Sequence, residues 1–268
     1  MSVKAVVLLL LACFIVSIYT RGNELNNLLF NGDYEFIDLT HPFDNNTVYW
    51  PNSQQFIFIK KTEDLGNDDS WYAANDFAAG EHGGTHIDAP YHFYKDGLHV
   101  EELPLDKLIV PLIVADVSSK VNGDPNFVLH KGDLDFMIND NMGKPCVIIF
   151  KFGWSKYFND RKKYLGHVDN SDKLNFPGLS GEVAEWITSA YKNIVGIGVD
   201  VASIDPGSSK DFPVHKTTSR NGLYVIENVN FSRDIPDNGC TALVLPMKIK
   251  SGTGAPLRLV AICPKQRK

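Results

Sequence analysis

The sequence has no strong excess of charge of either sign. Its 26 lysines and arginines stand against 32 aspartates and glutamates, which gives a net charge of -6. Proteins that bind nucleic acid or an anionic membrane surface need concentrated positive charge, so neither partner is expected. The chain also lacks a Pro/Ser-rich linker, a low-complexity block and an internal repeat. Its 268 residues are therefore expected to form one domain with a sizeable core.

Long apolar runs are missing except at the N-terminus. Lys4 precedes the mainly apolar residues 5–18, and polar residues begin at Thr20. A basic residue followed by a run of this length is typical of a secretory signal, and is short for a membrane span of roughly 20 residues. We expect residues 1–21 to be a signal peptide and residues 22–268 to be the mature domain. The protein is then secreted and has no further membrane contact, and an uncleaved signal anchor is the alternative.

Shorter apolar runs predict strands that are buried on both faces. A helix is expected between Ser180, which can serve as its N-cap, and Lys192, which suits its last turn. Strand, helix and strand in succession indicate an α/β layer, and a Gly-rich segment at 250–255 indicates a loose loop in a C-terminal antiparallel hairpin. We therefore expect an α/β fold with a mixed sheet. The expected strands cover residues 108–115, 147–152, 194–199, 242–245 and 257–262, and the helix would bury Val183, Trp186, Ile187, Ala190 and Tyr191.

Cysteine is scarce, with four residues in the chain. Cys13 lies in the expected signal, and the other three cannot all pair within one chain. Cys240 begins the first strand of the C-terminal hairpin and Cys263 ends the second, so the two are expected to face each other. An oxidising compartment would let them form a disulfide, and two unpaired core thiols are the alternative. Cys146 opens an apolar run and is expected to be a buried core thiol.

The densest group of chemically active side chains lies in the run His82-Gly-Gly-Thr-His86-Ile-Asp88-Ala-Pro-Tyr-His92-Phe93. Its three histidines and its aspartate all fall at even-numbered positions, so an extended chain would place them on one face. A straight strand would separate the Cα atoms of His82 and His86 by roughly 13 Å, which is near the limit for sharing one ion. The two glycines permit a bend that would bring them closer. Imidazole and carboxylate are ligands for zinc and similar ions, so this run predicts a metal site.

A second candidate group lies far downstream, at His215 and Glu227. Residues 223–226 are expected to form a strand that begins at the turn Asn221-Gly222. Glu227 would then be a carboxylate at the end of an apolar strand, where burial costs free energy unless a positive charge compensates it. A cation would do so. Taken alone, His215 is more often a loop histidine and Glu227 more often a hydrogen-bonding residue. Their distance along the sequence does not show whether they lie near the group from His82 to His92.

The run from His82 to Phe93 resembles the signature of the cyclase family of metal-dependent hydrolases, which includes bacterial-type kynurenine formamidases and isatin hydrolases. The resemblance extends through residues 37–42, 48–51, 176–180, 196–206 and 222–228 and through the C-terminal hairpin. It covers nearly everything after the expected signal. It implies a single-domain α/β fold related to swivelling β/β/α domains, and a homodimer.

The resemblance also implies roles for individual residues. Family members bind one or two divalent ions, zinc or manganese. By that pattern His82, His86 and Asp88 would hold the first ion, and Asp88, His215 and Glu227 would hold a second. The family's proton-transferring histidine falls on His92, and its aromatic substrate contact falls on Trp50. One departure is Asn52, where relatives commonly have glycine, and it puts the shape of the substrate wall in question.

The expected activity follows from these parts. A divalent ion lowers the pKa of bound water towards ~7, and the resulting hydroxide can attack an amide carbonyl. His92 would take a proton from water and deliver it to the departing nitrogen. The chain contains neither a Gly-x-Ser-x-Gly elbow nor a His-Glu-x-x-His motif. We expect a secreted metal-dependent arylformamidase that converts N-formyl-L-kynurenine to L-kynurenine and formate. The alternatives are a hydrolase of isatin or another cyclic amide, and a non-catalytic secreted binding protein on the same fold.

Overall fold

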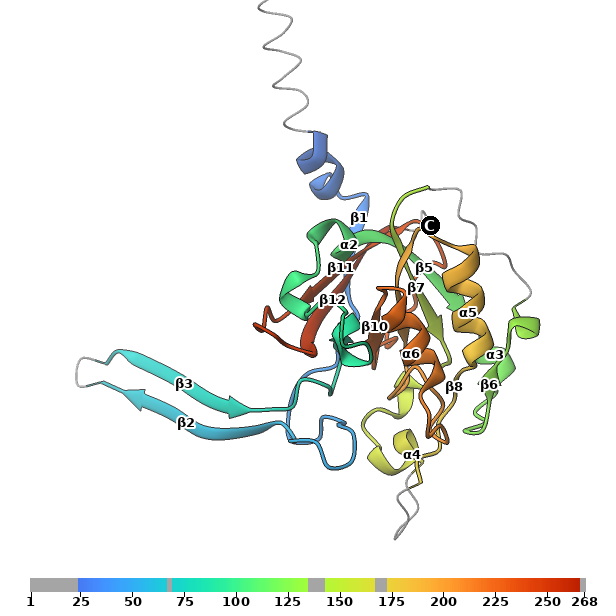
Figure 1. Ribbon diagram of the computed structural model, residues 1–268. Coiled ribbons are helices and arrows are strands. Elements are labelled where there is room, and N and C mark those ends of the chain that lie inside the picture. The colour runs from blue at the N-terminus through green and yellow to red at the C-terminus, as the bar shows by residue number, and fades with distance from the viewer. Residues whose placement is uncertain (1–23, 67–68, 135–142, 167–172, 266–268) are drawn as a thin grey trace, which may run out of the picture.

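The computed structural model describes residues 24–66, 69–134, 143–166 and 173–265 (Figure 1). The expected signal peptide, residues 1–21, lies outside these ranges. An eight-stranded sheet forms the centre of the molecule, in the order β1-β12-β11-β5-β7-β9-β10-β4. Its strands are β1 (Tyr34–Asp38), β4 (His86–Asp88), β5 (Ile109–Asp116), β7 (Cys146–Lys151), β9 (Ile194–Val199), β10 (Tyr224–Glu227), β11 (Cys240–Pro246) and β12 (Gly254–Pro264).

The sheet closes on itself through its longest strand, β12. The C-terminal half of β12 pairs with β1, while its first residues pair with β4, with Gly254 opposite Asp88 and Pro256 opposite His86. Strand β4 also pairs with β10, so it lies between β10 and β12 and completes a barrel. Strands β5, β7, β9 and β10 run parallel, and the other pairings are antiparallel. The predicted single-domain α/β fold with a mixed sheet is confirmed.

The apolar runs form buried strands because both of their faces meet a core. Alternate residues of β7 point to opposite sides of the sheet. Val147 and Ile149 face the barrel interior, whereas Ile148 and Phe150 face the layer of helices on the outside. All of them are inaccessible to solvent. The predicted strand over 194–199 has the same bounds as β9. The strands predicted over 242–245 and 257–262 correspond to β11 and β12, which extend beyond the predicted bounds at both ends.

The predicted helix is α5 (Gly181–Ala190), which packs on the outer face beside α6 (Pro213–Arg220) (Figure 1). The Ser180 hydroxyl accepts a hydrogen bond from the Val183 amide, as expected of an N-cap. Two details of the prediction were wrong. Ala190 is exposed, because the helix ends there, and Lys192 lies beyond the helix, although its Nζ donates to the Thr188 carbonyl at 2.6 Å. The remaining short helices include α2 (Leu105–Leu108), α3 (Ser118–Val121) and α4 (Arg161–Leu165).

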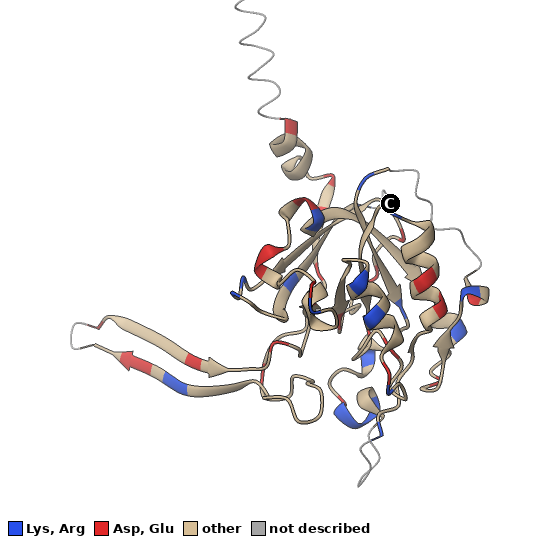
Figure 2. Ribbon diagram, viewed as in Figure 1, with Lys and Arg blue, Asp and Glu red and all other residues tan. Residues whose placement is uncertain are grey.

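A separate two-stranded ribbon projects from the body of the molecule. It consists of β2 (Ile57–Leu65) and β3 (Trp71–Ala78), and charged residues of both signs lie along β2 (Figure 2). A further short pairing joins β6 (Val128–Leu129) to β8 (Gly178–Leu179). Among the described residues, no helix is long and apolar enough to cross a membrane.

The C-terminal hairpin contains the predicted disulfide. In the register of β11 and β12, Thr241 faces Ile262, which places Cys240 opposite Cys263. The two sulfurs are bonded and the Cα atoms lie 4.3 Å apart. Cys146 is buried and lies outside this disulfide, as expected. The loop of the hairpin is not loose, because the Ser251 amide donates to the carboxylate of Glu101 at 2.8 Å.

Candidate active site

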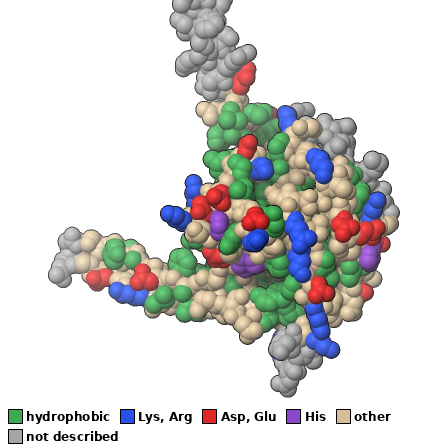
Figure 3. All heavy atoms as spheres, in the orientation of Figure 1, with side chains coloured by type: hydrophobic (Ala, Val, Ile, Leu, Met, Phe, Trp, Pro, Cys, Tyr) green, Lys and Arg blue, Asp and Glu red, His purple; other side chains and the backbone are tan. Residues whose placement is uncertain are grey.

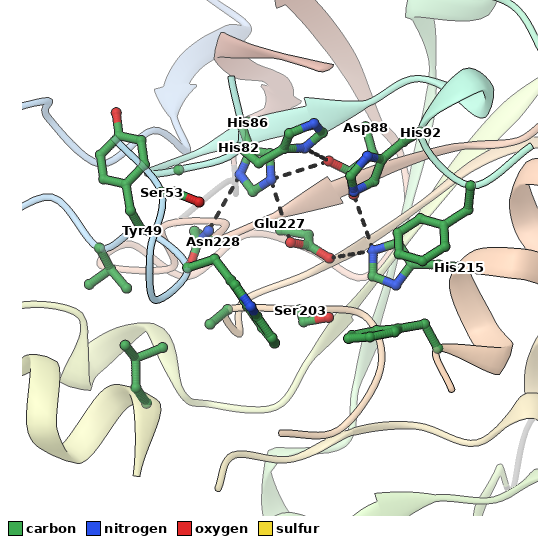
Figure 4. Close-up of a pocket in the computed structure, with 17 residues that line it drawn as sticks. Tyr49, Ser53, His82, His86, Asp88, His92, Ser203, His215, Glu227 and Asn228 are labelled. Atoms are coloured by element: carbon green, nitrogen blue, oxygen red, sulfur yellow. Dashed lines mark hydrogen bonds and ion pairs between the residues drawn. The ribbon is translucent and has the colours of Figure 1, made fainter. Parts of the chain in front are cut away.

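The predicted site residues meet in one pocket, beside the closing strand β4. The pocket has a volume of about 250 Å³, and Figure 4 shows polar side chains converging on one side of it. From the outside, histidine side chains are visible next to apolar ones on this face of the molecule (Figure 3). The lining includes all seven residues that were predicted to act in the site: Trp50, His82, His86, Asp88, His92, His215 and Glu227.

The first three candidate ligands lie close together because the chain bends before β4. Gly84 has φ +57°, a conformation that most residues avoid, and the rings of His82 and His86 are 5.5 Å apart. The Nδ1 atom of His82 lies 2.6 Å from Oδ1 of Asp88, and Nε2 of His86 lies 3.2 Å from the same oxygen. The predicted bend at the glycines is confirmed.

The downstream residues join this group in space. Helix α6 carries His215, whose Nε2 lies 3.3 Å from Oδ2 of Asp88 and 3.2 Å from Oε1 of Glu227. The other oxygen of Glu227 lies 3.5 Å from Nε2 of His86. Asp88 therefore contacts three imidazoles, those of His82, His86 and His215, and Glu227 contacts two of them, those of His86 and His215. The geometry brings together the two groups that sequence spacing alone did not connect.

The outward-facing nitrogens of the buried imidazoles are held by acceptors. Nδ1 of His86 lies 2.9 Å from the Gly84 carbonyl, and Nδ1 of His215 lies 2.7 Å from Oδ2 of Asp205. In the neutral form each imidazole donates from Nδ1 there, so the lone pair that it can offer to a cation is on Nε2, on the side of the carboxylates. Such outer hydrogen bonds are typical of metal-binding histidines. Asp205 is fully buried and was not predicted, although it lies only ten residues from His215.

The residues fit a divalent cation. Nε2 of His86 is buried and close to both carboxylates but makes no well-aligned hydrogen bond, and the ligand atoms of His86, Asp88 and Glu227 lie within 4.8 Å of one another. Burial opposes charge on both His86 and Asp88. The neighbouring carboxylates nevertheless raise the pKa of His86 to about 9, and the neighbouring imidazoles hold the pKa of Asp88 well below its usual value. A bound cation would compensate the negative charge of these carboxylates, and neutral imidazoles could coordinate it through their lone pairs.

His92 lies at the edge of this group, in the short helix Pro90–His92. Its ring stacks on that of His82 with the centroids 3.9 Å apart, and Phe93 covers it edge-on. Burial lowers the pKa of His92 to about 4, so its imidazole is neutral near pH 7. A neutral imidazole beside a cation site can accept a proton. A ring nitrogen of His92 also lies within 4.8 Å of ligand atoms of His82 and Asp88.

Apolar rings form the opposite wall of the pocket. Trp50 is 36% exposed and lies edge-on to Phe176 and Phe212, with ring centroids 6.5 and 6.1 Å away. Asn52, at the position where the family resemblance predicted glycine, has φ +73°, a left-handed conformation that asparagine tolerates better than most residues. The wall can therefore keep its backbone path despite the substitution.

Two further buried residues support the site without having been predicted. The Asn228 amide donates to the Gly84 carbonyl at 2.7 Å, and the Tyr164 hydroxyl donates to the Asn228 side chain at 2.8 Å. These bonds hold the bend at Gly84. His41, in contrast, does not line the pocket. It is buried and stacks on Phe158, with ring centroids 3.7 Å apart, so its role is structural.

Comparison with known proteins gives the family. The sequence model of the family described as "Putative cyclase" matches residues 37–206. The chain belongs to this cyclase family. It is 28% identical over 256 residues to isatin hydrolase from Roseibium aggregatum, covering 88% of this chain and 95% of that one. It is 26% identical over 228 residues to kynurenine formamidase from Bacillus cereus, covering 84% and 96%.

Solved structures agree with the sequence relatives. The crystal structure of an isatin hydrolase bound to the product analogue thioisatinate superimposes with a TM-score of 0.79 and 27% identity, covering 92% of this chain and 99% of that one. The predicted class, a metal-dependent hydrolase of the cyclase family, is confirmed.

Proposed function

We propose that this protein hydrolyses the C–N bond of a small, uncharged aromatic amide, with a cyclic amide of the isatin type as the favoured substrate. The observation that carries the proposal is the meeting of the His/Asp/Glu group with an aromatic wall in a single pocket. The group fits a cation that can activate water, and the wall fits a flat aromatic ring. Zinc and manganese are the expected ions, and the number bound is one or two.

The ligand set proposed for the cation is His82, His86 and Asp88, with His215 and Glu227 completing it or holding a second ion. When bound, the cation supplies Lewis-acid chemistry and lowers the pKa of water. His92, neutral and beside the group, would accept the proton from water and return it to the departing nitrogen. Trp50, Phe93 and Phe212 would hold the aromatic ring and exclude solvent from the site.

The pocket supports an uncharged substrate over an amino acid. Among the described residues that line it there is no lysine or arginine to pair with a carboxylate. N-formyl-L-kynurenine carries both a carboxylate and an ammonium group, and burying an unpaired charge is costly. Arylformamidase activity is the second candidate, favoured by the similarity to kynurenine formamidase.

A substrate panel tests this proposal. The protein is purified, its metal content is measured, and hydrolysis of isatin, N-formyl-L-kynurenine and the uncharged aryl formamide formanilide is compared before and after removal of the metal. We expect metal-dependent opening of isatin, with formanilide cleaved faster than N-formyl-L-kynurenine. Preference for N-formyl-L-kynurenine would establish the second candidate. A metal-loaded protein that cleaves none of them, yet binds them, would favour the binding-protein alternative.

We further propose that the protein is secreted and that residues 1–21 are removed. The apolar run at the N-terminus supports this, and so does the Cys240–Cys263 disulfide, because such bonds persist in oxidising compartments. N-terminal sequencing of protein recovered from the medium tests it. The expected homodimer also stays a prediction, which sedimentation velocity of the purified protein tests.

A further inference from the structure

The outward nitrogen of His82 is held differently from those of the other two histidines. Its Nε2 lies 2.8 Å from the hydroxyl oxygen of Thr253, a residue 171 positions further along the chain. That hydroxyl in turn donates to Oε2 of Glu81 at 2.6 Å, and the Thr253 amide donates to the same oxygen at 3.0 Å. Glu81, Thr253 and His82 thus form a relay that ends at the candidate cation site.

The position of the protons follows from counting donors and acceptors. A carboxylate only accepts, so the single hydroxyl proton of Thr253 points to Glu81. The hydroxyl oxygen must then accept from His82, which places a proton on Nε2. In the neutral imidazole the lone pair is then on Nδ1, the atom 2.6 Å from Asp88. Two acceptors cannot approach so closely unless a proton or a cation lies between them.

His82 therefore presents the opposite nitrogen from its neighbours. His86 and His215 donate from Nδ1 to the Gly84 carbonyl and to Asp205, so both present Nε2. For His82 the donor is Nε2 and the presented atom is Nδ1. The difference is set by the relay, because an imidazole without it could adopt either tautomer.

The relay depends on the loop of the C-terminal hairpin. Gly254 lies so close to His82 that a Cβ atom there would come within 2.5 Å of the ring carbon Cε1. Two side chains outside the hairpin hold the loop, Glu81 through Thr253 and Glu101 through the Ser251 amide at 2.8 Å. Backbone hydrogen bonds add to them, because the Val100 and Ala89 amides donate to the carbonyls of Gly252 and Thr253. Of the two side-chain contacts, only that of Glu81 reaches His82. The contact of Glu101 offers a control that loosens the loop and leaves the relay in place.

We propose that Glu81 and Thr253 are positioning residues that hold His82 with Nε2 protonated, so that Nδ1 is the atom offered to the cation. This inference rests on the proposed cation site and goes beyond it, because it assigns a role to two residues outside the ligand set. Removing the Thr253 hydroxyl should leave Nε2 without its acceptor and free His82 to turn or change tautomer. Outer hydrogen bonds of this kind typically contribute 10–100-fold to metal affinity.

Zinc affinity of three variants tests the proposal. Thr253→Val keeps the shape of the side chain but removes the hydroxyl, Thr253→Ser keeps the hydroxyl, and Glu101→Ala releases only the loop. With competition against a chelator, we expect Thr253→Val to bind zinc about 10–100-fold more weakly than the wild type. Thr253→Ser and Glu101→Ala should stay close to the wild type. Circular dichroism and thermal unfolding check that each variant is folded.

Imidazole nitrogen NMR of the zinc-loaded wild type provides a second readout that a purely structural role would not move. We expect the His82 proton on Nε2 and the His86 and His215 protons on Nδ1. A His82 proton on Nδ1, or equal affinity of Thr253→Val and the wild type, would overturn the inference and leave the proposed function standing. Equal losses in Thr253→Val and Glu101→Ala would overturn it in favour of loop anchoring. A wild type that binds no divalent cation would overturn both.

Discussion

Loss of the Cys240–Cys263 disulfide should lower the free energy of unfolding substantially. The bond joins residues 23 positions apart, and a loop of this length restricts the unfolded chain by about 3.4 kcal/mol in the chain-entropy account. Replacing both cysteines by alanine also removes two buried sulfurs, at about 1 kcal/mol each. We therefore expect Cys240→Ala/Cys263→Ala to lose roughly 5 kcal/mol, a large part of the 5–15 kcal/mol typical of a domain.

Urea unfolding of the oxidised protein and of the double variant measures this difference. Cys146→Ala is the matched control, because Cys146 is equally buried and takes no part in the disulfide. Twice the loss of unfolding free energy measured for Cys146→Ala gives the part that comes from removing two buried sulfurs. The rest of the loss in the double variant, about 3 kcal/mol, is the contribution of the cross-link. If the double variant loses no more than twice the Cys146→Ala value, the cross-link does not stabilise the fold. The midpoint of thermal unfolding should fall by roughly 10 °C for the cross-link alone.

Three substitutions test the site and its support. His92→Ala should keep its metal and lose 10²–10⁴-fold in turnover, the usual contribution of acid–base catalysis; a metal-free variant would instead make His92 a ligand. Asp88→Ala should lose metal and activity together, and a fully metallated, active protein would remove Asp88 from the ligand set. In Asp200→Asn, the carboxylate that accepts from the amides of Phe152, Trp154 and Ser155 is replaced by a group with one oxygen. At least one buried amide then lacks an acceptor, and we expect a loss of about 1–3 kcal/mol in urea unfolding, which an unchanged midpoint would contradict.

The strands and the first half of the site could be predicted because their signals are local. Apolar runs such as 147–152 and 194–199 are continuous in the sequence, and the burial of both faces follows from that pattern. The even spacing accounts for His86 and Asp88, which lie on one face of β4, and the two glycines indicate the bend that brings His82 to them. It does not account for His92, which reaches the group from the short helix Pro90–His92. The pairing of Cys240 with Cys263 follows from the antiparallel geometry of a hairpin.

The rest of the site depends on contacts between distant segments. Asp205 and Thr253 are common residue types in loops, and only the folded chain shows that each contacts a ligand histidine. The loop containing Thr253 was expected to be loose because it is rich in glycine. In the structure Gly254 allows close approach to His82, whereas Gly252 lies against Val100, Glu81 and Ile249. The ribbon of β2 and β3 was not predicted either. Nearly all of its residues are exposed, so its sequence lacks the alternation of apolar and polar residues by which a half-buried strand is recognised.

The closing strand β4 has a consequence for how this fold can acquire new substrates. Two candidate ligands, His86 and Asp88, occupy a three-residue strand that is hydrogen-bonded along both edges, to β10 and to β12. A backbone change there would open the barrel, so these positions tolerate little variation. Trp50 and Phe212 instead lie outside the central sheet, in connecting segments, which generally vary more than paired strands do. Substitutions in the aromatic wall can therefore change which substrate is bound while the candidate metal ligands stay the same. Differences in substrate preference should be sought in the segments around Trp50 and Phe212.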